Sequence, residues 1–166
     1  VHWQGTDITL VDTPGHVDFC AETERTLQVL DYCLLVINGS GGVQAHTRTL
    51  WRLLKAYRIP VFLFVNKMDQ PGADKQKLLR ELQSCLDENC LEFGSVAQGC
   101  GPETEGEALS EGFLEGLSMC CEELMEEYLE TGGLRTASIA RAVAGRSVFR
   151  CYFGSALRLE GVAELL

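Results

Sequence analysis

Two polar segments of this chain carry side chains that suit a nucleotide site, and each directly follows an apolar run. The first covers Asp12–His16 and reads D-T-P-G-H, and the second covers Asn66–Asp69 and reads N-K-M-D. Carboxylate, amide and imidazole groups can hold a metal ion, recognise a purine and orient water. Together the two segments indicate the chemistry of a guanine-nucleotide site.

The first segment suits the phosphate end of the nucleotide. Asp12, at the end of an expected strand, would hold Mg²⁺, directly or through water, against the β- and γ-phosphates. Gly15 has no Cβ, so its backbone N–H can approach the terminal phosphate. His16 is placed to orient the attacking water. We therefore expect nucleotide contacts from Asp12, Thr13, Pro14 and Gly15, and a catalytic role for His16.

The second segment suits recognition of the base. The Asp69 carboxylate can accept from the guanine N1–H and exocyclic amine, a pattern that adenine lacks. Asn66 can donate to the purine N7 and brace the loop, and the Lys67 stem can lie along the base. A lone Asp or His is more often a helix cap or a structural residue, but the two strings together favour a nucleotide site.

Two further loops need an assignment. One follows the last apolar run, and the other is rich in glycine and follows an earlier one. Gly154, Ser155 and Ala156 offer backbone N–H groups to the guanine O6. The Gly39–Gly42 loop resembles a phosphate loop in composition, but it lacks the Lys that such loops carry and follows a different strand. We expect it to be an ordinary turn.

The composition fits one globular domain in a reducing compartment. The chain has 166 residues, 46% of them hydrophobic, and eight cysteines without a C-x-x-C pair. This pattern disfavours zinc and predicts cysteines used as small hydrophobes in a cytoplasmic protein. No apolar run is long enough to cross a bilayer.

The negative charge is concentrated in one segment. Residues 81–130 hold fourteen of the 24 acidic residues and no Lys or Arg, within a chain of net charge -10. Such a segment is either a solvated surface or a face directed toward a basic protein. It would repel nucleic acid phosphates, which argues against direct DNA binding.

Apolar runs alternate with segments of helical periodicity, which predicts an α/β fold with a mostly parallel sheet in three layers. We expect buried strands over residues 8–11, 33–37, 61–65 and 148–153, the second covered on both faces. Asp74 should cap a helix, and further helices are expected over residues 118–129 and 138–144. Residues 91–146 are expected to form an acidic helical excursion before the last strand.

The motifs resemble the G domain of translational GTPases, a P-loop NTPase-like fold, and the resemblance covers nearly the whole chain. It is carried by Asp12–Phe19, Glu22–Arg25, Gly42–Gln44, Val65–Asp69 and Gly154–Ala156. These are similar to elongation factor G and to the ribosomal protection proteins of tetracycline resistance. The resemblance implies GTP/GDP and Mg²⁺ as ligands, the ribosome as partner, and His16 as the catalytic histidine.

Two details favour the ribosomal protection type. Eighty-four residues separate Asp69 from Gly154, which is short for the subdomain that elongation factor G inserts there, and Gln70 stands where elongation factor G usually has Arg. No G-x-x-x-x-G-K-S/T motif precedes Asp12, so we expect residues 1–166 to be a partial G domain, truncated at its N-terminus. Alone it should not hydrolyse GTP, because the phosphate cradle is missing.

Two other functions remain open at this point. A degenerate G domain could serve as a non-hydrolysing binding module, but such a module has no chemical need for Asp12, His16, Asn66 and Asp69 together. A GTPase of RNA modification or ribosome assembly would explain the base-reading loop, although not the histidine after D-T-P-G.

Overall fold

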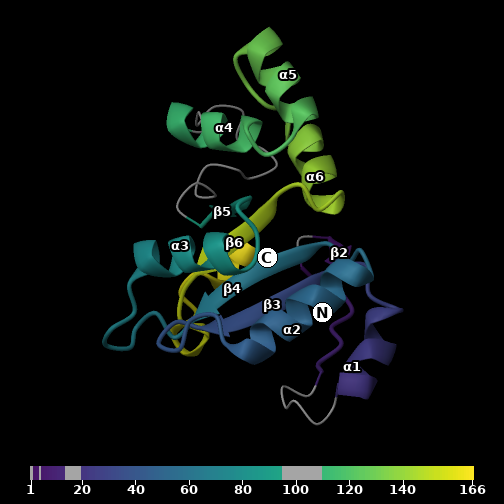
Figure 1. Cartoon of the computed structure of the whole chain (residues 1–166), viewed down its shortest axis with the longest axis vertical. Helices are drawn as coiled ribbons and strands as arrows, with labels where there is room; N and C mark the ends of the chain where they lie inside the picture. Colours follow the sequence, from purple (N-terminus) through teal and green to yellow (C-terminus); the bar gives the residue numbers. More distant parts are fainter. Residues whose placement is uncertain (1, 4, 14–19, 95–109) are drawn as a thin grey trace.

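The computed structural model describes residues 2–3, 5–13, 20–94 and 110–166 and shows a parallel sheet between two helical layers (Figure 1). Its four strands run in the order β3-β4-β6-β5, and every neighbouring pair is parallel. The strands of this sheet are β3 (Cys33–Asn38), β4 (Val61–Asn66), β5 (Cys90–Glu92) and β6 (Phe149–Phe153). The helices are α1 (Cys20–Leu27), α2 (Ala45–Ala56), α3 (Lys75–Cys85), α4 (Glu111–Ser118), α5 (Glu122–Thr131), α6 (Thr136–Ala144) and α7 (Val162–Leu165). The predicted α/β class is confirmed.

Side chains alternate between two cores on opposite faces of the sheet, as the period of a strand requires. Leu63 and Val65 of β4 enter a core shared with α1, α2 and α3. Phe64, between them, enters a second core shared with α4, α5 and α6. The predicted three layers therefore follow from a continuous apolar run that is buried on both faces.

Two helix ends show how local chemistry sets the boundaries. Asp74 caps α3, as predicted, because its carboxylate accepts from the Lys77 backbone N–H at 3.0 Å. Gly132 ends α5 in the left-handed region at φ 72°, where a side chain would be strained.

The expected strand over residues 8–11 is absent, which corrects the prediction. The chain forms a short hairpin of β1 (His2–Trp3) with β2 (Thr6–Asp7), and residues 8–13 then have no regular structure. Leu10 and Val11 are 73% and 49% exposed. A strand exists only where a neighbour completes a ladder of hydrogen bonds, and the strand pairings of the described residues do not include residues 8–11.

The expectation that β3 is covered on both faces was also wrong. In the described part of the chain β3 has one strand neighbour, β4, so it forms an edge of the sheet. Leu34 and Val36 are 46% and 55% exposed, while Leu35 and Ile37 are buried. The helices of the second core cover β4, β6 and β5 but do not extend over β3.

The excursion begins later than predicted, because Leu91 lies in β5 and pairs with Arg150 of β6. A three-residue strand gives too short an apolar run to be recognised from periodicity. Beyond it, the helix expected over residues 118–129 is α5, which begins at Glu122, and Ser118 instead ends a separate helix, α4, that was not predicted. The helix α6 begins at Thr136, two residues before the predicted start.

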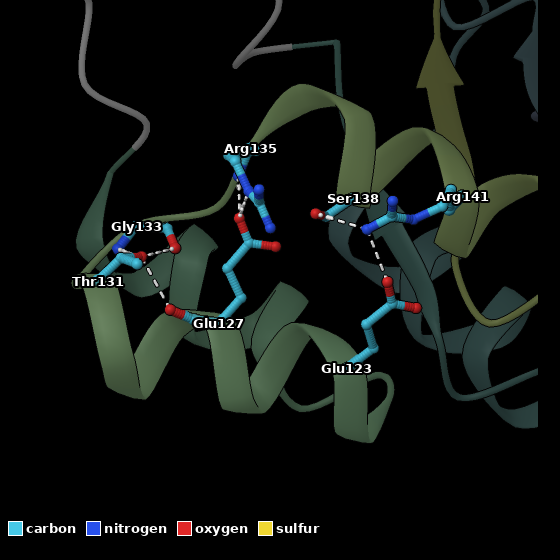
Figure 2. Close-up of polar contacts among 7 residues, drawn as sticks. All are labelled: Glu123, Glu127, Thr131, Gly133, Arg135, Ser138 and Arg141. Carbon is cyan, nitrogen blue, oxygen red and sulfur yellow. Dashed lines mark hydrogen bonds and ion pairs between the residues drawn. The ribbon is translucent and has the colours of Figure 1, made fainter.

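Ion pairs fasten the turn between α5 and α6 (Figure 2). Glu127 is 8% exposed and accepts from the backbone N and the Nε of Arg135, at 3.0 and 2.5 Å. On the next turn of α5, Glu123 pairs with Arg141 at 2.7 Å. The hydrogen bond from the Arg135 side chain lowers the pKa of Glu127 to about 2. The acidic segment is thus tied to basic residues that follow it in the chain.

Candidate nucleotide-binding site

The carboxyl ends of β3, β4 and β6 bring three loops to one edge of the sheet. Asn38 is in register with Asn66, and Val65 with Phe153, so the residues that follow these strands are neighbours. Figure 1 shows the loops after the three strands gathered at one end of the sheet. In open α/β sheets this edge is where ligands bind.

Asn66 holds the loops after β4 and β6 together. Its Oδ1 accepts from the backbone N of Lys67 at 2.7 Å and from the backbone N of Ala156 at 2.9 Å. The Met68 backbone N donates to the Gly154 carbonyl at 3.0 Å, which adds a second link. Lys67 has φ 64°, a left-handed backbone conformation that residues other than glycine rarely adopt. The hydrogen bonds around Asn66 offset the cost of this strained conformation. Because Oδ1 accepts both bonds, the role left to Nδ2 is donation, as a purine N7 requires.

Asp69 follows in the same loop, and a residue that the sequence analysis missed lies beside it. The Asp69 side chain is 18% exposed, and its Oδ2 lies 3.5 Å from the Nε of Arg158. Arg158 ends the 3₁₀ turn η3 (Ala156–Arg158) after β6. The only feature of the sequence that could have indicated this contact is a basic residue two positions after Ala156.

The loop after β6 is closed into a ring by a close backbone approach. Ser155 and Glu160 exchange two backbone hydrogen bonds, each of 3.1 Å. A Cβ added to Gly154 would overlap the Glu160 carbonyl oxygen and lie 2.8 Å from its carbon, so glycine is required there. Ser155 is buried, at 1% exposure.

The N–H groups expected to face the guanine O6 are already used inside the protein. Gly154 N donates to Val65 O at 3.0 Å, Ser155 N to Glu160 O, and Ala156 N to Asn66 Oδ1. This arrangement makes the third loop a brace for the base-reading loop. Contact with O6 requires an N–H shared between two acceptors.

The Gly39–Gly42 loop is an ordinary turn, as expected, but it supports the Asn66 loop. The Gly39 N donates to the Asn66 carbonyl at 2.7 Å, and a Cβ on Gly39 would lie 3.0 Å from that oxygen. Glu81 of α3 accepts from the Val43 N at 2.9 Å and holds the far end of the turn. Sequence periodicity gave no signal for this contact, which joins positions 38 residues apart.

The first motif is only partly described. Asp12 is exposed and Thr13 is half-buried, in a segment without regular structure. Figure 1 shows residues 5–13, in purple, toward the α1 side of the molecule. Pro14, Gly15 and His16 lie outside the described residues. The structure thus unites Asn66, Lys67, Asp69, Gly154, Ser155 and Ala156, and none of the contacts described here joins them to Asp12.

No group of three His, Cys, Asp or Glu side chains suited to a metal occurs in the described part of the chain. Mg²⁺ usually takes only one or two carboxylates and completes its shell with phosphates and water. The exposed Asp12 carboxylate fits that use, as a single ligand or through water.

Four thiols in the described part of the chain are poorly suited to chemistry. Cys90 and Cys151 are fully buried on β5 and β6. Burial raises the pKa of Cys33 to about 11 and that of Cys120 to about 12, so both thiols are protonated and unreactive near neutral pH.

Within the described ranges, no helix has the length and apolar character to span a bilayer. Comparison with known proteins adds a family. The Tetracycline resistance protein TetM of Streptomyces lividans is 37% identical to the chain over 171 residues. The match covers 97% of this chain and 26% of that protein. The whole chain, residues 1–166, matches the family described as Elongation factor Tu GTP binding domain. Together with the loops at the edge of the sheet, this match shows that the chain belongs to the family of the elongation factor Tu GTP binding domain.

Proposed function

We propose that this chain is the guanine-nucleotide-binding part of a ribosome-acting translational GTPase of the tetracycline-protection type. The observation that carries the proposal is the cross-braced pair of loops around Asn66, which places Asp69 at the carboxyl edge of a parallel sheet. The family match supports GTP as the nucleotide. The protein would act in the cytoplasm, where ribosomes and GTP are both present.

At the base end, each residue has a separate task. The Asp69 carboxylate accepts from N1–H and the exocyclic amine of guanine, and Asn66 Nδ2 donates to N7. The Lys67 stem lies along the base. The Ala156 N–H is shared between Asn66 Oδ1 and the guanine O6, while Gly154 and Ser155 maintain the loop.

At the phosphate end, the assignment rests on the motif of the first segment. Asp12 would hold Mg²⁺, directly or through water, Thr13 and Pro14 would contact the nucleotide, and Gly15 would offer its N–H to the terminal phosphate. Mg²⁺, when bound, neutralises charge that develops on the phosphates. His16 orients the attacking water.

The choice of the tetracycline-protection type has two supports. The relative from Streptomyces lividans is named a tetracycline resistance protein. Gln70 after the N-K-M-D loop and the short interval between Asp69 and Gly154 favour the same type over elongation factor G. Ribosome binding, and any displacement of the drug, belong to the whole protein.

Substitution of Asp69 by Asn in the full-length protein tests the base-reading role. An Asn amide would meet the guanine amine with a donor, whereas xanthine has a carbonyl there that accepts its hydrogen bond. We expect affinity for GTP to fall about 10- to 100-fold, as a hydrogen bond to a charged group is lost, and affinity for xanthosine triphosphate to rise.

The matched control is Asp31→Asn, which removes one exposed carboxylate outside the site. It should leave both affinities unchanged. An Asp69→Asn protein that still prefers GTP would remove Asp69 from base recognition and with it the proposed function.

A further inference from the structure

We propose that Arg158 sets the affinity for guanine by competing with the base for the Asp69 carboxylate. In the nucleotide-free protein Arg158 neutralises Asp69, and guanine must displace it to bind. The inference rests on the proposed function, because it takes Asp69 as the base-reading residue. It adds a residue of this chain that tunes the same site.

The starting observation is the ion pair itself. The Nε of Arg158 lies 3.5 Å from Oδ2 of Asp69, which is within ion-pair range but longer than a strong hydrogen bond. The Asp69 side chain is 18% exposed and the Arg158 side chain 59%. A carboxylate that is partly shielded from water benefits from a nearby cation, while the exposed guanidinium is free to move away.

Local hydrogen bonds fix the backbone at Arg158. Its own N–H donates to the Ser155 carbonyl at 3.1 Å, which closes the turn η3. The next residue, Leu159, has φ 60° and lets the chain return to pair with Ser155 through Glu160. The ring of residues 155–160 therefore holds the backbone of Arg158 in place on the loop after β6.

The two loops that carry the pair are tied to each other. The Met68 N–H donates to the Gly154 carbonyl, and the Ala156 N–H donates to Asn66 Oδ1. Asp69 and Arg158 thus stand on a common scaffold, so a ligand that engages Asp69 meets Arg158 without any rearrangement of the loops.

The competition follows from the chemistry of the two donors. A guanidinium presents neighbouring N–H groups around one carbon, and the guanine edge presents N1–H and an amine around C2 in the same way. Both are fork-shaped donors that suit a carboxylate. Because Oδ2 already faces Nε of Arg158, guanine and Arg158 compete for that oxygen.

An exposed ion pair is weak, so the effect is modest. Pairs of this kind contribute little, and their loss corresponds to at most about fivefold in an equilibrium constant. We therefore expect Arg158→Gln to bind guanine up to about fivefold more tightly. Salt should reduce the difference, because it screens the pair in the parent protein.

The experiment measures binding of guanosine and GDP to the full-length protein by displacement of a fluorescent GDP analogue. Guanosine is essential because it has no phosphate, whereas loss of a cation near the site also weakens the attraction of the GDP phosphates. The matched control is Arg52→Gln, an exposed arginine on α2 outside the three loops.

The expected result is tighter guanosine binding by Arg158→Gln at about 0.05 M salt, a smaller difference at about 0.5 M salt, and no change in Arg52→Gln. Unchanged or weaker guanosine binding by Arg158→Gln would overturn the competition. Failure of the parent protein to bind either ligand would instead refute the proposed function, so the two failures are distinguishable.

Discussion

Substitution of Gly154 by Ala should damage the base-reading loops through a single methyl group. The added Cβ would overlap the Glu160 carbonyl oxygen, so that carbonyl must move away. The movement breaks the two 3.1 Å bonds between Ser155 and Glu160. Ala156 follows in the same ring, so its bond to Asn66 is disturbed as well.

The magnitude follows from the bonds that are lost. Two backbone hydrogen bonds contribute about 1–3 kcal/mol to the free energy of unfolding. For a domain of this size, each kcal/mol lowers the melting temperature by about 2–4 °C. We therefore expect Gly154→Ala to melt about 2–12 °C below the parent protein, with GTP affinity reduced about tenfold or more because the brace of the base-reading loop is displaced.

The assay combines thermal unfolding with nucleotide titration of the same preparations. Gly116→Ala is the matched control, because a Cβ on Gly116 meets no atom within 4 Å and the residue lies inside α4. It should raise the free energy of unfolding by about 0.5–1 kcal/mol, since Ala is favoured over Gly in a helix. A Gly154→Ala protein that melts and binds GTP like the parent would refute the reasoning.

Three other predictions concern separate parts of the molecule. His16→Ala should lower ribosome-stimulated GTP turnover about 10²- to 10⁴-fold with little change in GTP affinity; unchanged turnover in a stopped-flow assay would exclude it from catalysis. The pKa of Glu127, held at about 2 by its hydrogen bond from Arg135 instead of the usual 4.5, makes its stabilising contribution complete above pH 4.5 and lost as the pH falls through about 2; acid unfolding followed by circular dichroism should be less steep in Glu127→Gln, and identical curves would contradict this. Glu81→Ala removes the 2.9 Å bond from the Val43 N–H and should lower the urea midpoint by an amount equivalent to about 1 kcal/mol. Glu115→Ala on α4 is the control and should leave the midpoint unchanged. A Glu81→Ala protein with the midpoint of the parent would show that Glu81 does not stabilise the turn.

Much of the fold was predictable because strong local signals agree with it. The continuous apolar run of β4, the Asp74 cap and the Gly-rich turn each act over a few residues, and the structure confirms all three. The parallel sheet followed from the alternation of strands and helices. Since parallel strands share one carboxyl edge, the meeting of the N-K-M-D loop with the loop after β6 was also predictable.

The remaining features depend on contacts between distant segments. Residues 8–11 have the apolar character of a strand but form none, since a strand also needs a ladder of hydrogen bonds to a neighbouring strand. The exposed face of β3 and the short β5 likewise reflect what packs beside them.

The sequence alone determined the chemistry available at the site, because the residue types of the two motifs define which groups a nucleotide can meet. Only the tertiary structure decided how those groups are held. The pairing of Asp69 with Arg158, the bond from Val43 to Glu81 and the ring closed at Glu160 join residues through space. No local pattern encodes such contacts, because they arise only when the sheet brings its loops to one edge.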